Sequence, residues 1–426
     1  MGIINIIFDS EILASGLYAN AGRSGIYFTA FNLLKEFLKR EDVNIILSCP
    51  LYRHKDVKNF LTKYFPENKF KILTDRPNNG KIKVYGKIKE ARQEAKDNDE
   101  YLLKNIFQIF MLIMSPVVSI ITKKYYNSEI KQYEENSIYF SPVYAVPKIF
   151  RKFCKYTVLY DTIPFVAEKK YGWYDKLIKS INKEDNYFAI SESARHDFLK
   201  FCPEINENKI HTTLLACDKN FKPADLEKIK CVKIKYNIPY DKKYIFSLCT
   251  LEPRKNLIRA VKTFVEFLKK NNIDGMYFVL GGGHWKEFIS ELEKEISGLG
   301  EYKDKIIKAG YIADEDLASL YSGAEWFVYT SQYEGFGLPP LEAMSSGCPV
   351  ITSNNSSLPE VVGDAGIMID WDSDEQHIKA YEKYYFNEDL RNQNRQKGIE
   401  RARLFSWEKC VSQMVEIIQK DLRIDE

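Results

Sequence analysis

Short apolar runs alternate with longer amphipathic stretches along most of this sequence. Residues 3–8 and 43–48 are apolar runs of strand length, and residues 26–38 between them repeat apolar side chains at helical spacing. A strand, a helix and a second strand in this order predict a parallel sheet, because two parallel strands need a long crossover connection. The chain therefore opens as an α/β protein.

The same alternation returns after residue 136 and divides the chain into two series. The later strands are expected at 137–140, 156–160, 187–190 and 210–215, and then at 244–249, 277–280, 306–309, 327–329 and 349–351. Residues 218–243, rich in lysine, proline and aspartate, are typical of a linker. From residue 374 onward the pattern is helical. We predict two doubly wound domains with a cleft between them, at 1–217 and 244–406.

Length and composition agree with two globular domains. The chain has 426 residues, of which 45% are hydrophobic and 28% charged. Its formal net charge of +3 is nearly neutral for this length and gives no reason to expect a nucleic-acid partner. The eight cysteines are scattered without metal-ligand spacing, and the first residues lack the basic region of a secretion signal. We therefore expect free thiols and a cytoplasmic location.

Residues 105–122 form a nearly uninterrupted apolar stretch, flanked by Lys104 and by Lys123-Lys124. Three interpretations stay open. A membrane-spanning helix needs ~20 apolar residues, and this shorter stretch contains Pro116. The stretch could instead form a buried helix pair broken at Pro116. It could also form an apolar surface that contacts lipid while the lysines meet anionic headgroups, which predicts peripheral membrane contact through 105–124.

A strand, a glycine turn, a helix and a second strand follow each other within residues 327–353. Gly335 and Gly337 lie in the turn, and two prolines open the helix, where a missing N–H is harmless. A helix N-terminus presents free N–H groups and a positive dipole end, which suits an anionic ligand. Glu334 in the turn and Glu342 in the helix bracket this site.

Two adjacent cations, Arg254 and Lys255, follow the strand expected at 244–249. Because the carboxyl ends of parallel strands share one edge of a sheet, we expect these cations on the same edge as the Glu334 turn. Cations bind phosphate, and carboxylates accept hydrogen bonds from sugar hydroxyls. The combination indicates a ligand with a diphosphate and a hydroxyl-rich group. The short DxD pattern at 370–372 lies in a polar patch, and we do not expect it to bind a metal.

The sequence EGFGLPPLE at 334–342 resembles the E-x7-E motif of the retaining glycosyltransferases of family 4. Further similar segments come in the family's order, namely LEPRKNL at 251–257, GGGHW at 281–285, the stretch 310–337 and PVITSNNSSLPEVVGDAG at 349–366. Fainter similarity lies in SGI at 24–26, LYDTIPF at 159–165 and AISESARHDF at 189–198. The resemblance implies the GT-B architecture, with two Rossmann-like domains. The donor nucleotide would bind in the second domain and the acceptor mainly in the first, and the last helix, 407–426, would pack back on the first domain.

The resemblance also implies a role for each matching residue. The catalytic residues would be Glu334, which binds hydroxyls of the donor sugar, and Arg254 and Lys255, which hold the diphosphate. The donor-binding residues would be Glu342 at the ribose, Phe336, Gly337 and Leu338 through main-chain N–H groups, Gly25 near the phosphate, Tyr311 and Ile312 at the base, and the pair Tyr160-Asp161.

Two positions depart from the family's pattern. Many relatives have His-Asp where this chain has Tyr160-Asp161, so the histidine contact to the donor sugar is absent or replaced by a phenol. Relatives often have Gly, or an Arg nearby, at the position of Cys249. Lys255 is therefore the better supported of the two phosphate cations.

We therefore expect an anomer-retaining glycosyltransferase that moves a hexose or deoxyhexose from a nucleotide sugar to a glycan or lipid-linked glycan. By analogy with relatives, the donor would be GDP-mannose and the setting bacterial surface polysaccharide biosynthesis. No cofactor or metal is expected, and the location would be the cytoplasm, with peripheral contact to the inner face of the cell membrane. Two alternatives stay open: a non-catalytic partner subunit of the same fold, and a sugar-nucleotide epimerase, which would turn over the donor without an acceptor.

Overall fold

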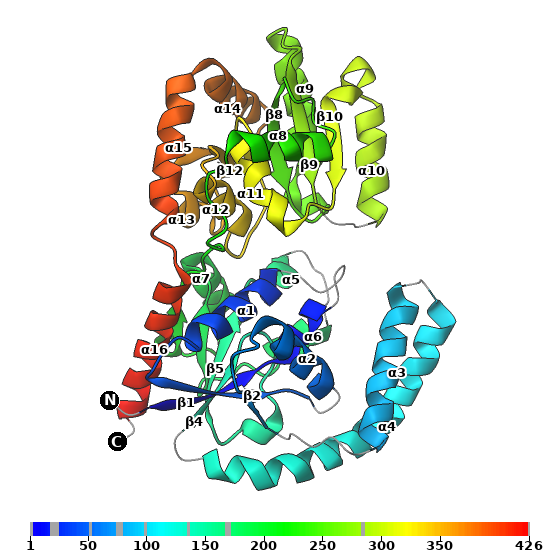
Figure 1. Cartoon of the computed structure of the whole chain (residues 1–426), viewed down its shortest axis with the longest axis vertical. Coiled ribbons are helices and arrows are strands. Elements are labelled where there is room, and N and C mark those ends of the chain that lie inside the picture. Colours follow the sequence, from blue (N-terminus) through cyan, green and yellow to red (C-terminus); the bar gives the residue numbers. More distant parts are fainter. Residues whose placement is uncertain are drawn as a thin grey trace.

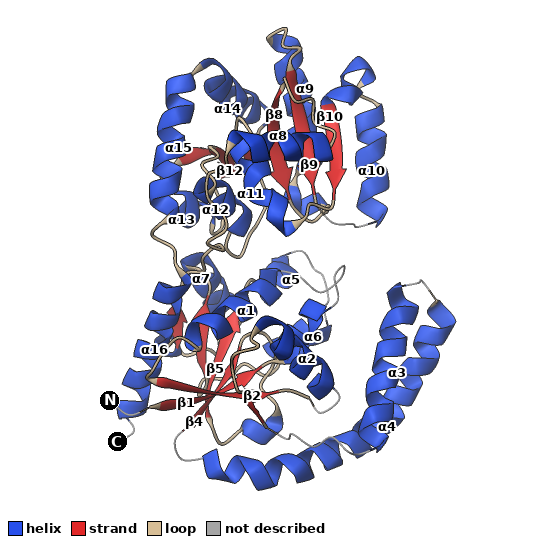
Figure 2. Ribbon diagram, in the orientation of Figure 1, coloured by secondary structure: helices blue, strands red, loops and turns tan. Residues whose placement is uncertain are grey.

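The structure is a computed structural model with two α/β domains stacked along the long axis of the molecule (Figure 1). It describes residues 3–17, 25–50, 53–73, 80–97, 100–133, 137–166, 172–282 and 286–424. In each domain helices lie on both sides of a parallel sheet (Figure 2). The predicted α/β class with two parallel, doubly wound sheets is thus confirmed.

The first sheet, within the described part of the chain, has the strand order β3-β2-β1-β4-β5-β6-β7. Its strands are β1 (Ile4–Asp9), β2 (Val43–Ser48), β3 (Lys71–Ile72), β4 (Ser137–Ser141), β5 (Cys154–Leu159), β6 (Asn186–Ala189) and β7 (Ile210–Thr212). Its helices are α1 (Gly25–Phe37), α2 (His54–Tyr64), α3 (Gly80–Asp97), α4 (Tyr101–Ile130), α5 (Ile163–Val166), α6 (Gly172–Ile178) and α7 (Glu192–Phe201). The central strands are apolar runs because both faces of a parallel sheet are covered.

The second sheet has the order β10-β9-β8-β11-β12-β13, again with parallel pairs. Its strands are β8 (Lys243–Leu248), β9 (Met276–Gly281), β10 (Ile306–Gly310), β11 (Phe327–Tyr329), β12 (Val350–Ser353) and β13 (Gly366–Ile369). Its helices are α8 (Leu226–Lys235), α9 (Leu257–Lys270), α10 (Lys286–Ser297), α11 (Asp314–Gly323), α12 (Leu338–Ser345), α13 (Leu358–Val362), α14 (Asp374–Phe386) and α15 (Glu388–Ala402). The strand order reverses between β8 and β11, and open α/β sheets bind ligands at such a reversal.

Short 3₁₀ helices connect several of these elements. They are η1 (Glu11–Leu17), η3 (Lys131–Tyr133), η4 (Lys148–Phe150), η5 (Glu207–Lys209), η6 (Pro253–Lys255) and η7 (Gly300–Lys305). The turn η6 follows β8 and therefore lies directly at the reversal point of the second sheet.

The segment 218–243, expected as a linker, contains helix α8. Asp225 caps this helix, because its carboxylate accepts a hydrogen bond from the N–H of Lys228 at 2.9 Å. The helix lies against α11, where the phenol of Tyr236 donates to the carboxylate of Asp316 at 2.7 Å. This part of the segment is therefore packed on the second domain.

The last helix, α16 (Trp407–Ile424), returns to the first domain and lies beside α1 (Figure 1). The phenol of Tyr156 on β5 donates to the carboxylate of Asp421 at 2.7 Å. The guanidinium of Arg40 donates to the hydroxyl of Ser412 at 3.0 Å. The first domain is thus completed by residues from the far end of the chain.

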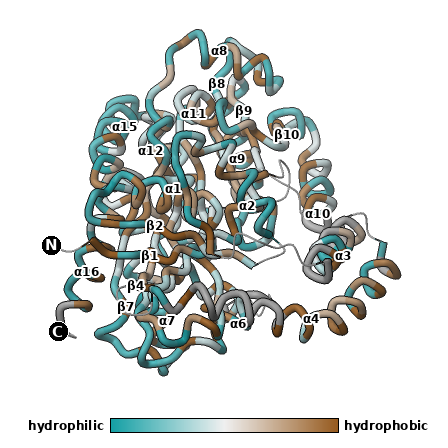
Figure 3. Tube along the Cα trace, turned by 60° about the horizontal axis from the view of Figure 1, so that its bottom comes forward, coloured by the Kyte–Doolittle hydropathy of each residue, from teal (hydrophilic) through white to brown (hydrophobic). Residues whose placement is uncertain are grey.

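Helix α4 differs from the buried, broken helix pair that was one expectation for 105–122. It runs through Pro116 without a break, and α3 packs beside it in a hairpin at the side of the first domain (Figure 1). Its exposed apolar side chains include Leu102 (75%), Ile109 (58%), Ile113 (65%) and Ile120 (70%). Figure 3 shows this hydrophobic helix at the edge of the molecule. The expectation of a buried pair is therefore wrong, because the hairpin stands out from the domain. A search of the described residues finds no helix with the length and apolar character needed to cross a membrane.

Candidate active site

Two loops meet where the strand order of the second sheet reverses. The loop after β8 carries Arg254 and Lys255, and the loop after β11 carries Glu334. The ammonium of Lys255 lies 2.6 Å from Glu334 Oε1, and the guanidinium of Arg254 lies 3.1 Å from the same oxygen. The three residues that the sequence places on one edge of the sheet are thus in direct contact.

This ion cluster is buried, and its charges balance. Arg254 Nη2 lies 2.7 Å from Glu252 Oε1, so two cations face two carboxylates. The ammonium of Lys255 also donates to the phenol oxygen of Tyr329 at 2.8 Å. Burial by itself would raise the pKa of Glu334, but the charges of Lys255 and Arg254 outweigh it and hold this pKa below its ordinary value. Glu334 is therefore ionised at neutral pH.

Serine side chains fix the backbone of the Glu334 turn. The hydroxyl of Ser357 lies 2.7 Å from the carbonyl oxygen of Phe336 and 3.0 Å from that of Glu334. The hydroxyl of Ser356 accepts the N–H of Glu334 at 3.0 Å. Gly337, which precedes α12, has a φ of 113°, a left-handed conformation that favours glycine. The turn is therefore held in one shape by side chains outside it.

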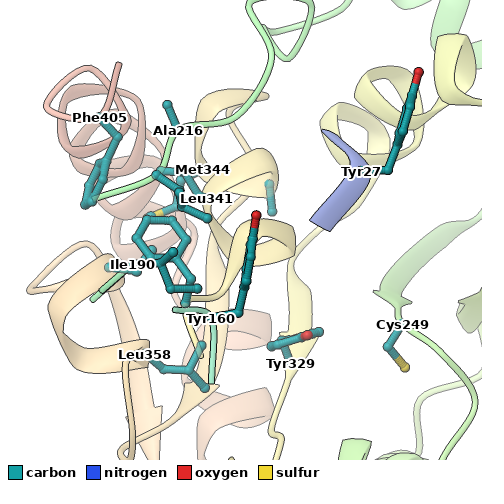
Figure 4. Close-up of a cluster of buried hydrophobic side chains, with 14 of the residues drawn as sticks. Tyr27, Tyr160, Ile190, Ala216, Cys249, Tyr329, Leu341, Met344, Leu358 and Phe405 are labelled. Atoms are coloured by element: carbon teal, nitrogen blue, oxygen red, sulfur yellow. The ribbon is translucent and has the colours of Figure 1, made fainter. Parts of the chain in front are cut away.

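The ring of Phe336 points into the core. It packs edge-on against Phe405 at a centroid distance of 6.0 Å. Figure 4 shows Phe405 in a cluster of buried side chains with Leu341, Leu358 and Ile190. Because Ile190 follows β6, this apolar cluster joins the two domains. The ring of Phe336 is therefore part of the core and is not exposed at the surface of the turn.

Glu342 lies further along α12, where its carboxylate accepts a hydrogen bond from the phenol of Tyr321 at 3.1 Å. Burial raises the pKa of Glu342 to about 7, although the bond from Tyr321 lowers it. Its partners thus differ from those of Glu334, and its pKa is raised whereas that of Glu334 is lowered. Such a difference suits two separate tasks.

The start of α12 faces the first domain. A Cβ added to Gly25, the first residue of α1, would lie 3.8 Å from Leu338 Cδ1. Gly25 and Leu338 come from different domains, so a Cβ at position 25 would be in van der Waals contact with the other domain. A residue larger than alanine at position 25 would press against Leu338, the first residue of α12.

Tyr160 and Asp161, at the end of β5, lie against the Glu334 turn. A Cβ added to Gly335 would lie 2.6 Å from the carbonyl oxygen of Tyr160 and 2.8 Å from Asp161 Cβ. Burial raises the pKa of Asp161 to about 6, while the N–H of Ile163 and the charge of Arg254 lower it. The phenol of Tyr160 donates to the carbonyl of Pro142 at 2.8 Å. The main chain of Tyr160, and not its hydroxyl, therefore faces the turn.

Tyr311 and Ile312 follow β10 and are not brought to the ion cluster, since β9 separates β10 from β8. Tyr311 is 59% exposed and offers a flat aromatic surface. Ile312 is buried, and its Cγ1 would lie 2.9 Å from a Cβ added to Gly281. Tyr311 is thus the more accessible of the two residues expected at the base.

The DxD pattern takes part in local hydrogen bonds. The carboxylate of Asp370 accepts from the side-chain amide of Gln376 at 2.7 Å, and the carbonyl of Trp371 accepts from Asn256 at 2.6 Å. Over the described ranges, no group of three or more His, Cys, Asp or Glu side chains is placed to hold a metal ion. That no metal is needed stays a prediction.

Besides Tyr160 and Asp161, further residues of the first domain that the sequence did not assign to the site contact the Glu334 turn, among them Asp197 and Ser191. The phenol of Tyr333 donates to the carboxylate of Asp197, and the hydroxyl of Ser191 donates to the carbonyl of Gly335 at 2.7 Å. A contact across more than a hundred residues leaves no local pattern. Two signals were available in the sequence: the position of Tyr333 directly before Glu334, and the family resemblance of residues 189–198, which contain Ser191 and Asp197.

Residues 230–401 match the family model described as "Glycosyl transferases group 1". This segment includes both loops of the ion cluster and helix α12. The match therefore falls on the half of the chain that carries the cations and the two motif carboxylates.

Several characterised proteins are similar to this chain. The O-antigen chain mannosyltransferase B of Escherichia coli is 33% identical over 240 residues, which are 56% of this chain and 61% of that protein. The serotype-specific mannosyltransferase WbdA of Escherichia coli is 28% identical over 260 residues, which are 59% of this chain and 31% of that protein. Each match spans less than two thirds of the relative's own length.

Solved structures resemble the whole chain. The crystal structure of Anabaena Alr3699/HepE in complex with UDP and glucose has a TM-score of 0.67 at 13% identity, and covers 98% of this chain and 100% of that one. The structure of WaaG, a glycosyltransferase involved in lipopolysaccharide biosynthesis, has a TM-score of 0.61 at 13% identity, with 97% and 99% covered. At such identity the likeness concerns the fold, and the predicted GT-B fold is confirmed.

Proposed function

We propose that this protein is a glycosyltransferase of the retaining, E-x7-E type of family 4, with a nucleotide sugar as donor. The observation that carries the proposal is the buried contact of Lys255 and Arg254 with Glu334, at the reversal point of the second sheet. The match to a glycosyltransferase family model and the similarity to mannosyltransferases support it.

The proposed donor contacts follow from the chemistry of each group. Lys255 and Arg254 bind the diphosphate, and the ionised Glu334 accepts hydrogen bonds from the sugar hydroxyls. Glu342 accepts hydrogen bonds from the ribose, and the main chain at 336–338 binds the sugar and diphosphate at the start of α12. The remaining proposed contacts are Gly25 at the phosphate, Tyr311 and Ile312 at the base, and Tyr160 and Asp161 at the donor sugar.

In the proposed reaction the bond between the anomeric carbon and the leaving phosphate oxygen breaks. A bond from the acceptor hydroxyl oxygen forms on the same face of the sugar, and the leaving phosphate oxygen takes the hydroxyl proton. Negative charge grows on the diphosphate in an oxocarbenium-like transition state, where Lys255, Arg254 and the α12 dipole stabilise it. Because these groups supply the positive charge, we propose that turnover needs no divalent metal or other cofactor.

We propose GDP-mannose as donor and a glycan or lipid-linked glycan as acceptor. The relatives named as O-antigen and serotype-specific mannosyltransferases support this choice and a role in bacterial surface polysaccharide biosynthesis. The cytoplasm, where nucleotide sugars are made, is the proposed location.

Donor turnover by the purified chain tests the function. GDP-, UDP- and dTDP-sugars are offered with and without mannose-containing acceptors, in EDTA, and nucleotide diphosphate release and the product anomer are measured. We expect GDP-mannose to be used and the α-anomer to be retained. A partner subunit would release nothing, an epimerase would convert the donor without an acceptor, and an inverted product would refute the retaining mechanism.

We also propose that α4 holds the first domain against an anionic membrane surface. The exposed apolar residues of α4 recur every three or four residues along one side, at Leu102, Ile106, Ile109, Ile113 and, two turns on, Ile120. Residues 101–128 contain three lysines and no acidic residue, which complements anionic headgroups.

The neighbours of this apolar stripe favour lipid over a partner helix. A coiled-coil partner is selected by charged residues that flank the apolar seam. In α4 the positions beside the stripe hold apolar residues in place of charged ones, namely Leu103, Phe110 and Leu112. These side chains are exposed and widen the apolar face. A broad apolar face bordered by lysines is the pattern of an interfacial helix.

Vesicle flotation tests this surface. Wild-type protein should float with phosphatidylglycerol vesicles and less with phosphatidylcholine, and Ile109→Glu/Ile113→Glu should stay in the soluble fraction. Leu226→Glu/Ile234→Glu, which changes two exposed apolar residues of α8, is the matched control. Equal flotation of both double variants would refute the proposal. The proposal would also be refuted if the wild-type protein were a dimer and only the α4 variant were a monomer. In that case the apolar face of α4 would serve self-association.

A further inference from the structure

The turn that carries Glu334 is also a contact between the two domains. Tyr333, directly before Glu334, extends its side chain into the first domain. Its phenol donates to the carboxylate of Asp197 on α7 and lies 3.0 Å from the hydroxyl oxygen of Thr162. Thr162 is fully buried beside Asp161 at the end of β5. One hydroxyl group thus joins the turn to two separate elements of the first domain.

The main chain of Tyr333 is held by the same guanidinium that contacts Glu334. Arg254 Nη1 donates to the carbonyl of Tyr333 and lies 3.1 Å from Glu334 Oε1. The carbonyl of Arg254 in turn accepts the N–H of Gln332 at 2.9 Å. A displacement of Tyr333 would therefore move both Arg254 and Glu334.

A hollow of about 530 Å³ lies between the domains beside this contact, with Tyr333, Asp197 and Glu360 among its lining residues. Next to it, the hydrogen bonds to Asp197 and Thr162 join the Tyr333 phenol to the first domain.

We propose that Tyr333 is a positioning residue that makes the placement of Glu334 and Arg254 depend on closure of the two domains. When the domains are closed, Asp197 and Thr162 fix the phenol, and the main chain of the turn is fixed with it. When the domains separate, the phenol loses both partners and the turn is held from the second domain alone. The role in catalysis rests on the proposed transferase function.

This dependence suits a transferase. The sugar and diphosphate must be aligned within a fraction of an ångström for the barrier to fall, and small displacements of the groups that hold them lower the rate. An open enzyme, whose turn is held from the second domain alone, would bind the donor but would activate it less. Donor activation would then wait until the first domain, which binds the acceptor in GT-B enzymes, is in place.

Kinetics of Tyr333→Phe test the role, because this change removes one oxygen atom and keeps the ring. We expect kcat to fall about tenfold or more, because the change removes the hydrogen bond to the charged Asp197 and also the one to Thr162, with the donor Kd within about twofold of wild type. Tyr240→Phe, with a largely exposed ring, is the matched control. An unchanged kcat in Tyr333→Phe, or a loss confined to the donor Kd, would overturn the positioning role.

Variants of the partner residue give an independent comparison. Asp197→Ala removes the acceptor and should behave like Tyr333→Phe, whereas Asp197→Asn keeps an acceptor oxygen and should retain most of the activity. The double variant Tyr333→Phe/Asp197→Ala should be no slower than Tyr333→Phe, since the phenol that Asp197 holds is already absent there. Additive losses would show that the two residues act separately and would overturn the proposal.

Hydrogen exchange of the ligand-free protein separates this inference from the proposed function. Peptides covering 331–337 should exchange faster in Tyr333→Phe and Asp197→Ala, and at the wild-type rate in Asp197→Asn and Tyr240→Phe. Wild-type exchange in Tyr333→Phe would refute the contact itself. If the exchange pattern holds while no donor is turned over, the contact stands and the transferase function fails.

Discussion

Lys255 has two partners inside the ion cluster, Glu334 at 2.6 Å and Tyr329 at 2.8 Å. Its ammonium is therefore preorganised, and charge that develops on a leaving diphosphate would meet it without rearrangement. Lys255→Ala should lower kcat by ~10²-fold or more, the cost of removing one such donor. Steady-state kinetics with Lys262→Ala, on the surface of α9, as control provide the measurement. A wild-type kcat in Lys255→Ala would exclude the assigned role.

The raised pKa of Glu342 gives a prediction for donor binding. With a pKa of about 7, this carboxyl is increasingly protonated as the pH falls through neutrality, and the protonated form is a poorer acceptor for ribose hydroxyls. The donor KM should therefore rise as the pH is lowered from 8 to 6. In Glu342→Ala the KM should be high throughout and lose this pH dependence. A low KM at pH 8 in this variant would mean that the ribose lies elsewhere.

The raised pKa of Glu342 also predicts how the stability of the protein depends on pH. A carboxyl whose pKa is higher in the folded state binds more protons folded than unfolded, so the free energy of unfolding falls as the pH rises from about 4.5 to about 7. Glu342→Gln removes this cost and should raise the Tm at pH 8 more than at pH 5. Thermal denaturation at both pH values measures it, with the exposed Glu301→Gln as control. An equal change of Tm at both pH values would contradict a raised pKa of Glu342 in the folded state.

At the scale of elements, α4 and α8 show what the sequence could predict. Strands and helices of the two sheets follow from apolar runs, helical spacing and glycine turns, because those patterns act over a few neighbouring residues. The apolar stretch of α4 predicts a helix but not its surroundings, since burial depends on what packs beside it. Helix α8 has four lysines within ten residues. They hide the apolar spacing by which the buried Val232 would predict a packed helix.

The docking of α16 on the first domain gives the prediction at this scale. Tyr156 is fully buried, and its phenol donates to Asp421 from a strand that lies 265 residues earlier in the chain. Tyr156→Phe should lower the free energy of unfolding by ~1 kcal/mol, the usual contribution of one hydrogen bond. Asp421→Ala should cost a similar amount, and the double variant should cost less than the sum. Urea unfolding measures all three, and additive costs would show that the two residues do not interact.

At the scale of the whole molecule, the candidate site depends on how the domains meet. Arg254, Lys255 and Glu334 could be predicted together, because a parallel sheet places the ends of β8 and β11 on one edge. The contacts of Tyr333 with Asp197 and of Ser191 with Gly335 could not. They join residues more than a hundred positions apart, and their geometry is set by the relative placement of two complete domains.

Glu360 offers a test of that placement. Its carboxylate, on α13 of the second domain, accepts the N–H groups of Glu192 and Ser193 at 2.9 and 3.1 Å, at the first turn of α7 in the first domain. The negative charge also faces the positive end of the α7 dipole. Burial raises the pKa of Glu360, and the two N–H groups lower it. Protonation at acid pH should therefore weaken this contact between the domains.

We expect the radius of gyration, measured by small-angle X-ray scattering, to increase from pH 8 to pH 5 in the wild-type protein. Glu360→Ala should have the larger radius already at pH 8, because hydrogen bonds to a charged acceptor are worth about 1.5–3 kcal/mol each. The radius of Glu360→Ala should change less with pH than that of the wild type, because the titrating carboxyl is absent. Glu388→Ala, on the surface of α15, should behave like the wild type. A pH-dependent expansion of equal size in Glu360→Ala would assign the effect to another group.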